Sequence, residues 1–284
     1  MCARRPTRGI RSGWRSPGMT GSTYDAIPDF GLLYDSVPLY AARKDIAFYV
    51  EEATRSPGPV LEVGCGTGRI LLPIARAGRT IAGLDSSALM LARCRERVAA
   101  EPALVEKGRV TLHHGDMRAF DLGATFSLVI APFRVMQHLT QVDDQLRFLD
   151  AVRRHLAPPP GGRLVFDVFN PDFKALVGAD GAEHEDTPEQ RLADGRTLRR
   201  TARVKQVRWA DQVSEVELIY YVAPRPGAPP DRFVQGFEMR WYLPVELTHL
   251  LARAGFRISA MYGDFTRTPL MDGAPEQVVC AEPA

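Results

Sequence analysis

The sequence contains few cysteines and no long apolar run. No segment of its 284 residues approaches the roughly 20 apolar residues that a membrane-spanning helix needs, so we expect a soluble, cytoplasmic protein with no membrane partner. The four cysteines are scattered, at Cys2, Cys65, Cys94 and Cys280, and form no C-x-x-C pair. This spacing argues against a zinc site or a disulfide framework and favours a reducing compartment.

A large excess of charge of one sign is also missing. The formal net charge is +2, and five basic residues precede the first acidic residue, Asp25. These five are Arg4, Arg5, Arg8, Arg11 and Arg15. Without them, 31 of the 36 basic side chains stand against 34 acidic ones, a net charge of −3. A mildly acidic folded part disfavours a nucleic-acid partner.

The composition otherwise fits a globular protein with a polar leader. With 45% hydrophobic and 25% charged residues, the chain can bury a full core, as one large domain or one domain with an elaboration. Residues 1–20 are rich in Arg, Gly, Ser and Pro, so we expect them to be disordered. This leader resembles a transit peptide in composition but lacks an amphipathic helix pattern, and we favour a translation start at Met19.

One stretch, VLEVGCGTGRILL over residues 60–72, predicts a short buried strand, a glycine turn and the start of a helix. Gly64, Gly66 and Gly68 leave the turn without side chains, so a ligand can lie on the backbone and meet the free N–H groups of the helix start. Cys65 lies inside this turn, where we attribute its presence to its small size.

Two ligands compete for such a turn, a dinucleotide and S-adenosylmethionine. The dinucleotide pattern G-x-G-x-x-G needs a glycine where this chain has Arg69. Glu62 would repel a pyrophosphate but suits a ligand that carries an ammonium and a sulfonium group. Asp85 ends the next apolar run, where a carboxylate can accept from both ribose hydroxyls. The combination therefore favours S-adenosylmethionine, whereas the alternative is a tight turn with Asp85 as a helix cap.

The segments Glu62 to Gly68, Asp85 and Gly115-Asp116-Met117 together resemble the class I S-adenosylmethionine-dependent methyltransferases. The likeness runs from about Tyr24 to the C-terminus. It implies an α/β fold with a doubly wound, Rossmann-like, seven-stranded and mostly parallel sheet, whose final strand over residues 276–281 is antiparallel. It also implies S-adenosyl-L-methionine as the cofactor.

The resemblance assigns cofactor-binding roles to residues in several segments. An N-terminal lid would contribute Tyr and Arg side chains to the methionine carboxylate, and an acidic residue would accept from the adenine amino group. The expected cofactor-binding residues are Tyr34, Tyr40, Arg43, Glu62, Gly64, Cys65, Gly66, Gly68, Asp85, Ser86, Met90, Asp116, Met117 and Ala131. The alternative for the lid is that its aromatic residues only pack a helix onto the domain, with Arg43 in solvent.

A metal site beside Asp116 is not expected. His113 and His114 are adjacent in a predicted strand over residues 109–114, so their imidazoles point to opposite faces and cannot share one ion.

The methyl acceptor should bind beyond the predicted strand over residues 126–131, because ligands of open parallel sheets lie where the strand order reverses. The expected substrate-binding residues are Pro132, Phe133, Arg134, His138 and Trp241. Methylases of DNA-base amino groups have Asn or Asp, then Pro-Pro and an aromatic residue at this place. Since this chain has Ala131-Pro132-Phe133, a nucleobase amine is disfavoured.

The second half of the chain departs from a simple doubly wound pattern. Three β segments, 198–209, 212–223 and 232–243, predict an antiparallel insertion that serves as a substrate roof, a homodimer surface or both. Residues 178–187 are polar and acidic, and we expect them to be mobile. The cations of the first segment, Arg199, Arg200, Arg203 and Lys205, suggest a solvated strand face.

These patterns divide the chain into five parts: a disordered tail (1–22), an N-terminal helical lid (23–58), a cofactor-binding core (59–177), an antiparallel β insertion (178–243) and a return to the core sheet (244–284). His138 is the candidate catalytic residue, because its place resembles that of a histidine in sugar-amine N-methyltransferases, although Arg134 departs from their pattern.

We therefore predict a methyltransferase that acts on a small molecule, with an amine ahead of a hydroxyl group as the nucleophile. The alternatives are an O-methyltransferase and a non-catalytic module that binds the cofactor.

Overall fold

The computed structural model describes residue 27 and residues 29–158 and 161–284. The tail predicted over residues 1–22 lies outside this part of the chain. Within the described ranges, no helix has the length and apolar character needed to span a bilayer.

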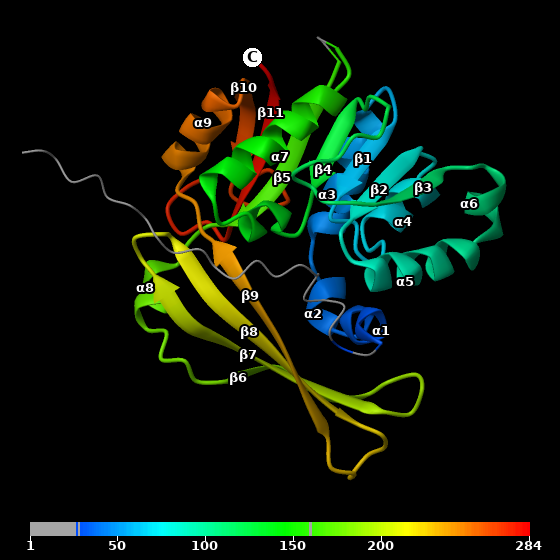
Figure 1. Ribbon diagram of the computed structural model, residues 1–284, viewed down its shortest axis with the longest axis vertical. Helices are drawn as coiled ribbons and strands as arrows, with labels where there is room; N and C mark the ends of the chain where they lie inside the picture. Colours follow the sequence, from blue (N-terminus) through cyan, green and yellow to red (C-terminus); the bar gives the residue numbers. More distant parts are fainter. Residues whose placement is uncertain (1–26, 28, 159–160) are drawn as a thin grey trace, which may run out of the picture.

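The larger layer is a seven-stranded sheet (Figure 1). In spatial order its strands are β10 (Phe256–Tyr262), β11 (Glu276–Pro283), β5 (Arg163–Phe169), β4 (Leu128–Ala131), β1 (Val60–Val63), β2 (Ile81–Asp85) and β3 (Val110–His114). Only β11 is antiparallel to its neighbours. This confirms the predicted mostly parallel, doubly wound sheet, and β1 pairs with β4 at the reversal of strand order. The prediction started β4 too early, since Phe126 forms only an isolated bridge with Leu156.

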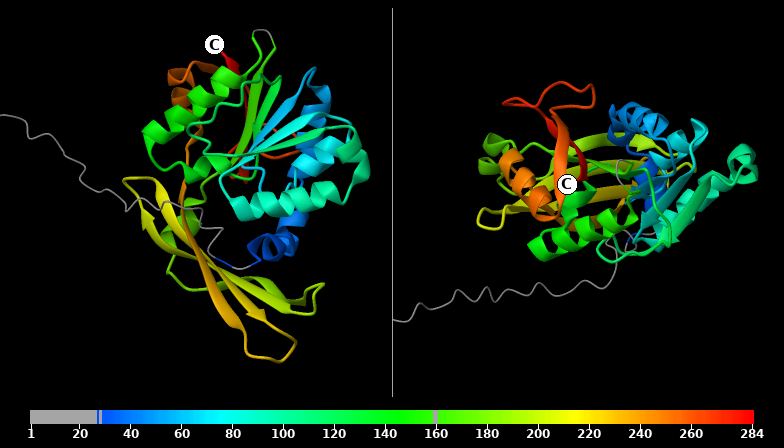
Figure 2. Two further views of the ribbon diagram at one scale, coloured as in Figure 1. Left: turned by 45° about the vertical axis from the view of Figure 1, so that its right-hand side comes forward. Right: turned by 90° about the horizontal axis from the view of Figure 1, so that it is seen from above.

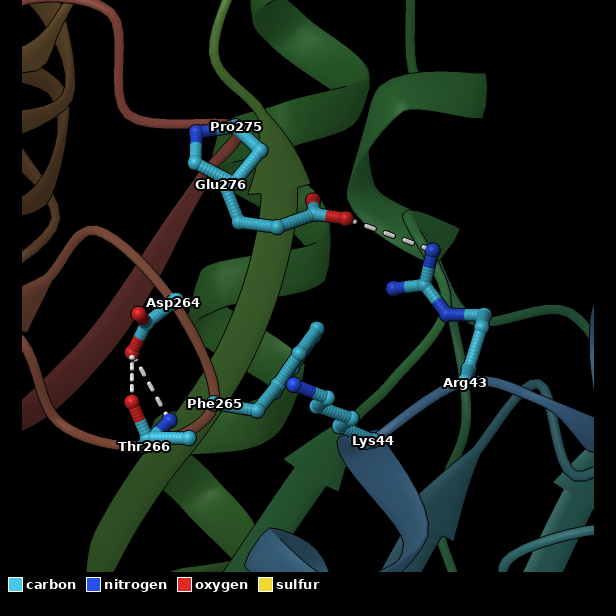
Figure 3. Close-up of a pocket in the computed structure, with 7 residues that line it drawn as sticks. All are labelled: Arg43, Lys44, Asp264, Phe265, Thr266, Pro275 and Glu276. Atoms are coloured by element: carbon cyan, nitrogen blue, oxygen red, sulfur yellow. Dashed lines mark hydrogen bonds and ion pairs between the residues drawn. The ribbon is translucent and has the colours of Figure 1, made fainter.

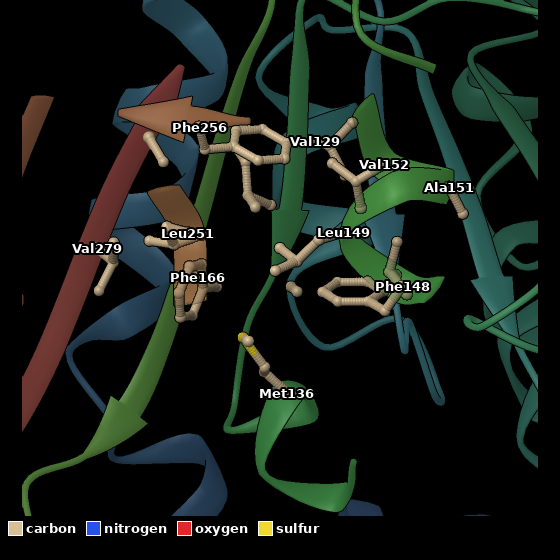
Figure 4. Packing of buried hydrophobic residues seen from close by; sticks show 14 of the residues in the cluster. Val129, Met136, Phe148, Leu149, Ala151, Val152, Phe166, Leu251, Phe256 and Val279 are labelled. Carbon is tan, nitrogen blue, oxygen red and sulfur yellow. The ribbon is translucent and has the colours of Figure 1, made fainter. Parts of the chain in front are cut away.

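Helices cover both faces of this sheet (Figure 2). On one face lie α3 (Asp45–Arg55), α4 (Leu71–Arg76), α5 (Ala88–Ala99) and α6 (Pro102–Glu106), and on the other lie α7 (Val142–His155) and α9 (Pro244–Arg253). Successive residues of β1 alternate between the faces: Val60 packs with α3 and α4, and Leu61 with α7 and α9. All four residues of β1 are buried, and Figure 4 shows the packing around Phe148 and Phe166 on the second face. This burial fixes the strand ends that carry the candidate site.

The smaller layer is an antiparallel sheet, the β platform, which extends away from the core (Figure 1). It contains β6 (His184–Arg191), β7 (Thr197–Arg208), β8 (Val213–Ala223) and β9 (Asp231–Arg240), and the short α8 (Phe173–Val177) precedes it. The three predicted segments are confirmed as β7, β8 and β9, but the prediction missed a fourth strand, β6, which begins inside the segment that was expected to be mobile. β6 has the sequence HEDTPEQR, which lacks apolar alternation, so only its backbone pairing with β7 reveals it. The third predicted segment also ran too far, since β9 ends at Arg240 and not at residue 243.

Two short helices, α1 (Phe30–Asp35) and α2 (Pro38–Ala41), lie between the platform and the core. We call them the lid. Phe30 and Leu33 of the lid share an apolar cluster with Leu198, Tyr220 and Val222 of the platform. The lid therefore joins the far end of the platform to the sheet that carries the glycine turn.

Arg200 corrects the expectation of a solvated face on β7. Its side chain is only 2% exposed and forms an ion pair with Asp186 of β6, with Nε 2.9 Å from Oδ1. It also donates to the hydroxyl of Tyr40 in α2. Because an arginine in an antiparallel strand is usually exposed, the sequence did not reveal that this one is buried against the lid.

Candidate functional site

The glycine turn follows β1 and requires its three glycines. Gly64, Gly66 and Gly68 have φ angles of 74°, 53° and 85°, a left-handed region that residues with a side chain rarely adopt. The amides of Gly64 and Cys65 donate to the Leu84 carbonyl at 2.7 and 3.1 Å, which fixes the turn to β2. The turn thus presents bare backbone at the edge where the strand order reverses.

Glu62 lies in β1 immediately before this turn and is 2% exposed. Its Oε2 atom is buried and has no hydrogen-bond partner among the described residues. Burial raises the pKa of Glu62 well above its usual value, because a charged carboxylate loses its solvation there. A buried acceptor of this kind fits the ammonium group of S-adenosylmethionine, which would supply both the hydrogen bond and the compensating charge.

Asp85 ends β2 and holds the turn in shape. Its Oδ2 accepts from the Gly66 amide at 2.7 Å, and its Oδ1 accepts from the Ser87 amide at 2.8 Å. Ser87 caps α5, accepting from the Met90 amide at 3.1 Å. The Met90 methyl group lies 3.5 Å from the position that a Cβ on Gly66 would occupy. Asp85 and Met90 thus both lie against the turn at Gly66, while Ser86 is exposed.

Asp116 follows β3, as expected, but it has a partner that sequence reasoning missed. Arg118 donates from Nε to both carboxylate oxygens of Asp116 at 2.9 Å, and this pairing lowers the pKa of Asp116. Met117 packs against the main core cluster. The nearby His114 imidazole lies 3.0 Å from the Ser86 carbonyl, and the described residues contain no group of three or more side chains suited to a metal ion.

The lid and the end of β4 form an aromatic cluster. The rings of Tyr34 and Tyr40 are 4.6 Å apart between centroids, and Phe133 lies 5.1 Å from Tyr40 and 6.5 Å from Tyr34. The guanidinium groups of Arg43 and Arg69 lie 4.9 and 4.8 Å from the Phe133 centroid. The predicted residues Tyr34, Tyr40, Arg43 and Phe133 therefore come together, and Arg69 joins them.

Three carboxylates that sequence reasoning missed hold Arg43 in place. They are Asp45, Asp167 and Glu276, at N–O distances of 3.0, 3.3 and 3.3 Å. Arg69 also binds Asp45 through two hydrogen bonds, from Nη1 to Oδ1 at 2.8 Å and from Nη2 to Oδ2 at 2.7 Å. Arg43 therefore does not lie free in solvent, and a cofactor carboxylate would have to exchange with one of these partners. The one sequence signal was Asp167, an acid inside the otherwise apolar strand β5.

The segment after β4, which we call the acceptor loop (residues 132–138), starts from the buried residues Ala131 and Pro132. Phe133 and Arg134 have φ angles of 60° and 68°, so two successive residues with side chains adopt the left-handed region. The Phe133 amide donates to Asp167 Oδ1 at 2.8 Å, which holds this conformation. Strained backbone that the surroundings hold in this way is typical of ligand sites.

His138 ends the 3-10 helix Val135–His138, and its ring lies 5.4 Å from that of Phe237 in β9. Burial lowers the pKa of His138 to about 4, and a hydrogen bond with the Glu238 backbone only partly opposes this. The Trp241 indole is buried and packs against Phe173 and Trp209, and the neighbouring Arg240 carbonyl accepts from Gln137 of the acceptor loop, so its place at the acceptor stays a prediction.

Known proteins share this architecture. A family model described as a methyltransferase domain matches residues 60–161. The dTDP-3-amino-3,4,6-trideoxy-α-D-glucopyranose N,N-dimethyltransferase of Streptomyces venezuelae is 30% identical over 237 residues, which cover 83% of this chain and 91% of the relative. The dTDP-3-amino-3,6-dideoxy-α-D-glucopyranose N,N-dimethyltransferase of Streptomyces fradiae is 33% identical over 50% of this chain and 55% of its own.

A solved structure agrees with these relatives. The S-adenosylmethionine-bound amino pentose methyltransferase CalS10 from Micromonospora echinaspora superposes with a TM-score of 0.63. It is 27% identical, and the match covers 87% of this chain and 96% of that one. The chain uses S-adenosylmethionine as its cofactor, and it belongs to the class I S-adenosylmethionine-dependent methyltransferases.

Proposed function

We propose that this methyltransferase transfers a methyl group to the amine of a nucleotide-linked amino sugar. The observation that carries the proposal is the likeness to a sugar-amine N,N-dimethyltransferase over 83% of this chain, and the state of His138, the candidate base of the acceptor loop, supports it. With a pKa of about 4, its imidazole is neutral and only weakly basic at physiological pH. An amine that binds in its neutral form needs no base, whereas a hydroxyl group must lose its proton during attack.

The relatives support the same acceptor class. Those from Streptomyces venezuelae and Streptomyces fradiae are both described as dimethyltransferases of dTDP-linked 3-amino sugars. The first of them spans most of this chain, including the platform that lies beyond the family model. We therefore extend the likeness to the part of the chain that would cover the acceptor.

Each group of residues has a separate task in this proposal. Glu62, the glycine turn and Asp85 hold the amine, backbone and ribose sides of the cofactor. Tyr34, Tyr40 and Arg43 lie at the methionine end of the cofactor, and Phe133, whose ring contacts both tyrosine rings, meets the acceptor. When bound, S-adenosylmethionine supplies a methyl group that its sulfonium already activates. Alignment of this methyl group with the acceptor amine can then lower the activation barrier by roughly 7 to 11 kcal/mol.

The direct test compares two sugars that differ only in the nucleophile. One is dTDP-3-amino-3,6-dideoxy-α-D-glucopyranose, the sugar named for the Streptomyces fradiae relative. The matched control carries a hydroxyl group in place of the amine. Mass spectrometry and NMR of the products should show methyl groups on the nitrogen of the first sugar and little transfer to the second. Comparable rates of transfer to the hydroxyl sugar would contradict the amine assignment.

A non-catalytic role is tested by extending this experiment to more acceptors. If a broader panel of amines and hydroxyl compounds yields no methylated product, while calorimetry still shows cofactor binding, the chain acts as a binding module and the proposal fails.

A further inference from the structure

A pocket of about 340 Å³ opens beside the acceptor loop, between the start of α3 and the loop that joins β10 to β11 (Figure 3). The residues that matter in its lining are Arg43, Lys44, Asp264, Phe265, Thr266 and Glu276. We call it the Glu276 pocket. Its size falls in the range of small-molecule sites, and Phe265 gives it an apolar wall.

Glu276 has one carboxylate oxygen without a hydrogen-bond partner among the described residues. The residue is 7% exposed, and both of its cationic neighbours converge on the same oxygen. Arg43 lies 3.3 Å and Arg134 lies 3.1 Å from Oε1. Oε2 is buried and has no hydrogen-bond partner among the described residues. Since a buried carboxylate oxygen is costly to leave unpaired, it marks a position that a ligand can fill.

The other carboxylate of the pocket, Asp264, has no oxygen that is both buried and without a partner among the described residues. Asp264 Oδ1 accepts from the amide and the hydroxyl of Thr266 at 2.8 Å, and from the Thr268 amide at 3.1 Å. These hydrogen bonds lower its pKa to about 2 and close the turn on which it lies. Glu276 is therefore the acceptor to which a ligand in this pocket would bind.

The pocket is connected to the acceptor loop through Arg43. The Arg43 guanidinium contacts Glu276 on one side and Asp167 on the other, both at 3.3 Å. Asp167 in turn accepts from the Phe133 amide at the start of the acceptor loop. The Glu276 pocket thus adjoins the acceptor loop, which also contacts Glu276 directly through Arg134 at 3.1 Å.

The charges around Oε2 define the kind of group that fits. Arg43 and Arg134 both bind Oε1 of Glu276, and Lys44 also lines the pocket, so cations already compensate the charge of this carboxylate. A ligand carboxylate or phosphate has no proton to donate to Glu276. A neutral O–H donor satisfies Oε2 without adding charge, because Oε1 already binds the two cations.

We propose that the Glu276 pocket binds the hydroxyl-bearing part of the sugar acceptor, with Glu276 Oε2 accepting a hydrogen bond from a ring hydroxyl. This inference rests on the proposed function, since it assumes a sugar acceptor. Glu276 then selects hydroxylated sugars over their deoxygenated analogues, because the analogue leaves Oε2 unpaired.

The sugars named for the two relatives form a matched pair, since the 3-amino-3,4,6-trideoxy sugar lacks the 4-hydroxyl group of the 3-amino-3,6-dideoxy sugar. Calorimetry on the complex with S-adenosylhomocysteine measures the binding of each sugar without any turnover. We expect wild-type protein to bind the 4-hydroxylated sugar roughly 10- to 100-fold more tightly. Glu276→Gln should reduce this ratio of affinities towards one, mainly by weakening the binding of the hydroxylated sugar.

A matched control variant is Glu282→Gln on the same strand, where Glu282 forms a surface ion pair with Arg257. It should keep the wild-type ratio. The ratio compares two ligands on one protein sample, so partial loss of stability in Glu276→Gln does not affect it.

The outcomes separate the two proposals. If Glu276→Gln weakens the binding of both sugars equally, and so leaves the ratio of their affinities unchanged, the proposed role of Glu276 is overturned. Failure of both sugars to bind wild-type protein would also overturn it. The proposed function fails separately, when the sugars bind but no amine is methylated.

Discussion

The two sheets of this protein are stabilised in different ways. β1 is four residues long and buried along its whole length, as is β4. The platform strands β7 and β8 are 12 and 11 residues long, and their outer face is held largely by charge pairs. Arg208, for example, contacts both Glu215 and Glu238, and Arg203 contacts Glu217. Packing therefore positions the residues of the core sheet. The platform instead depends on surface ion pairs and on the contacts that its two ends make with the rest of the protein.

The two ends of the platform determine how it meets the core. At one end, Gln137 of the acceptor loop is fully buried; it donates to the Arg240 carbonyl at 2.7 Å and accepts from the Phe169 amide at 2.9 Å. At the other end, Arg200 binds Tyr40 of the lid. The family model matches residues 60–161, which include the glycine turn and the acceptor loop and end before the platform.

The largest effect should come from Asp167 in the core sheet. Asp167→Ala leaves Arg43 and the Tyr49 hydroxyl without their shared carboxylate, to which Tyr49 donates at 2.7 Å. Breaking a buried pair in this way costs about 3 to 5 kcal/mol, so the free energy of unfolding in urea should fall by that amount. Asp150→Ala is the control, because Asp150 forms only surface pairs on α7 and should change stability by less than about 1 kcal/mol. Similar losses in both variants would remove the proposed distinction between buried and surface pairs.

The second effect concerns cofactor affinity. Asp85→Ala removes the acceptor of the Gly66 amide as well as the proposed ribose contact, and should weaken S-adenosylmethionine binding by about 1 to 3 kcal/mol. Calorimetry measures this directly. Wild-type affinity in this variant would contradict the ribose assignment and show that the turn keeps its shape without Asp85.

The core could be predicted because its signals are local. Glu62, the glycines and Asp85 lie at the ends of short apolar runs, and the strand ends of a parallel sheet necessarily meet at one edge. The carboxylates around Arg43 could not be predicted, because their partners are distant: Arg43 and Asp167 are 124 residues apart. β6 and Arg200 were missed for the opposite reason, since a polar strand and a charged strand residue normally indicate solvent. Arg200 is buried because the lid packs on the platform, whereas β6 stays largely exposed and forms through its backbone pairing with β7.

A smaller effect should test the link between the platform and the lid. Arg200→Met and Tyr40→Phe each remove one side of the same hydrogen bond. If Arg200 acts through Tyr40, the losses in unfolding free energy should be non-additive in the double variant, by about 1 kcal/mol. Arg199→Met is the control, because Arg199 faces Glu185 and the Tyr221 ring on the other side of β7. Its loss in unfolding free energy should be additive with that of Tyr40→Phe. Additive losses in the Arg200 cycle would mean that the Arg200–Tyr40 hydrogen bond does not contribute to docking of the lid.

The smallest effect is expected at His138, where the acceptor loop meets the platform. Because burial lowers its pKa from 6.5 to about 4 in the folded state, the unfolded chain takes up the proton first as the pH falls. The stability that neutral His138 contributes is therefore complete above pH 6.5 and is lost as the pH falls towards 4. His138→Asn should remove this part of the pH dependence, which melting temperatures at several pH values can measure.

The same variant separates the amine from the hydroxyl acceptor. For an amine, His138→Asn should lower kcat by less than about tenfold, because the nucleophile needs no base and only its position changes. For a hydroxyl group the imidazole would have to take the proton, and its loss should lower kcat by roughly 10² to 10⁴. Measuring kcat against pH for the folded variant and the wild-type protein distinguishes the two. Since the ring is held against Phe237 and is neutral across the working pH range, we expect the modest effect, and a drop beyond a thousandfold would refute the amine assignment.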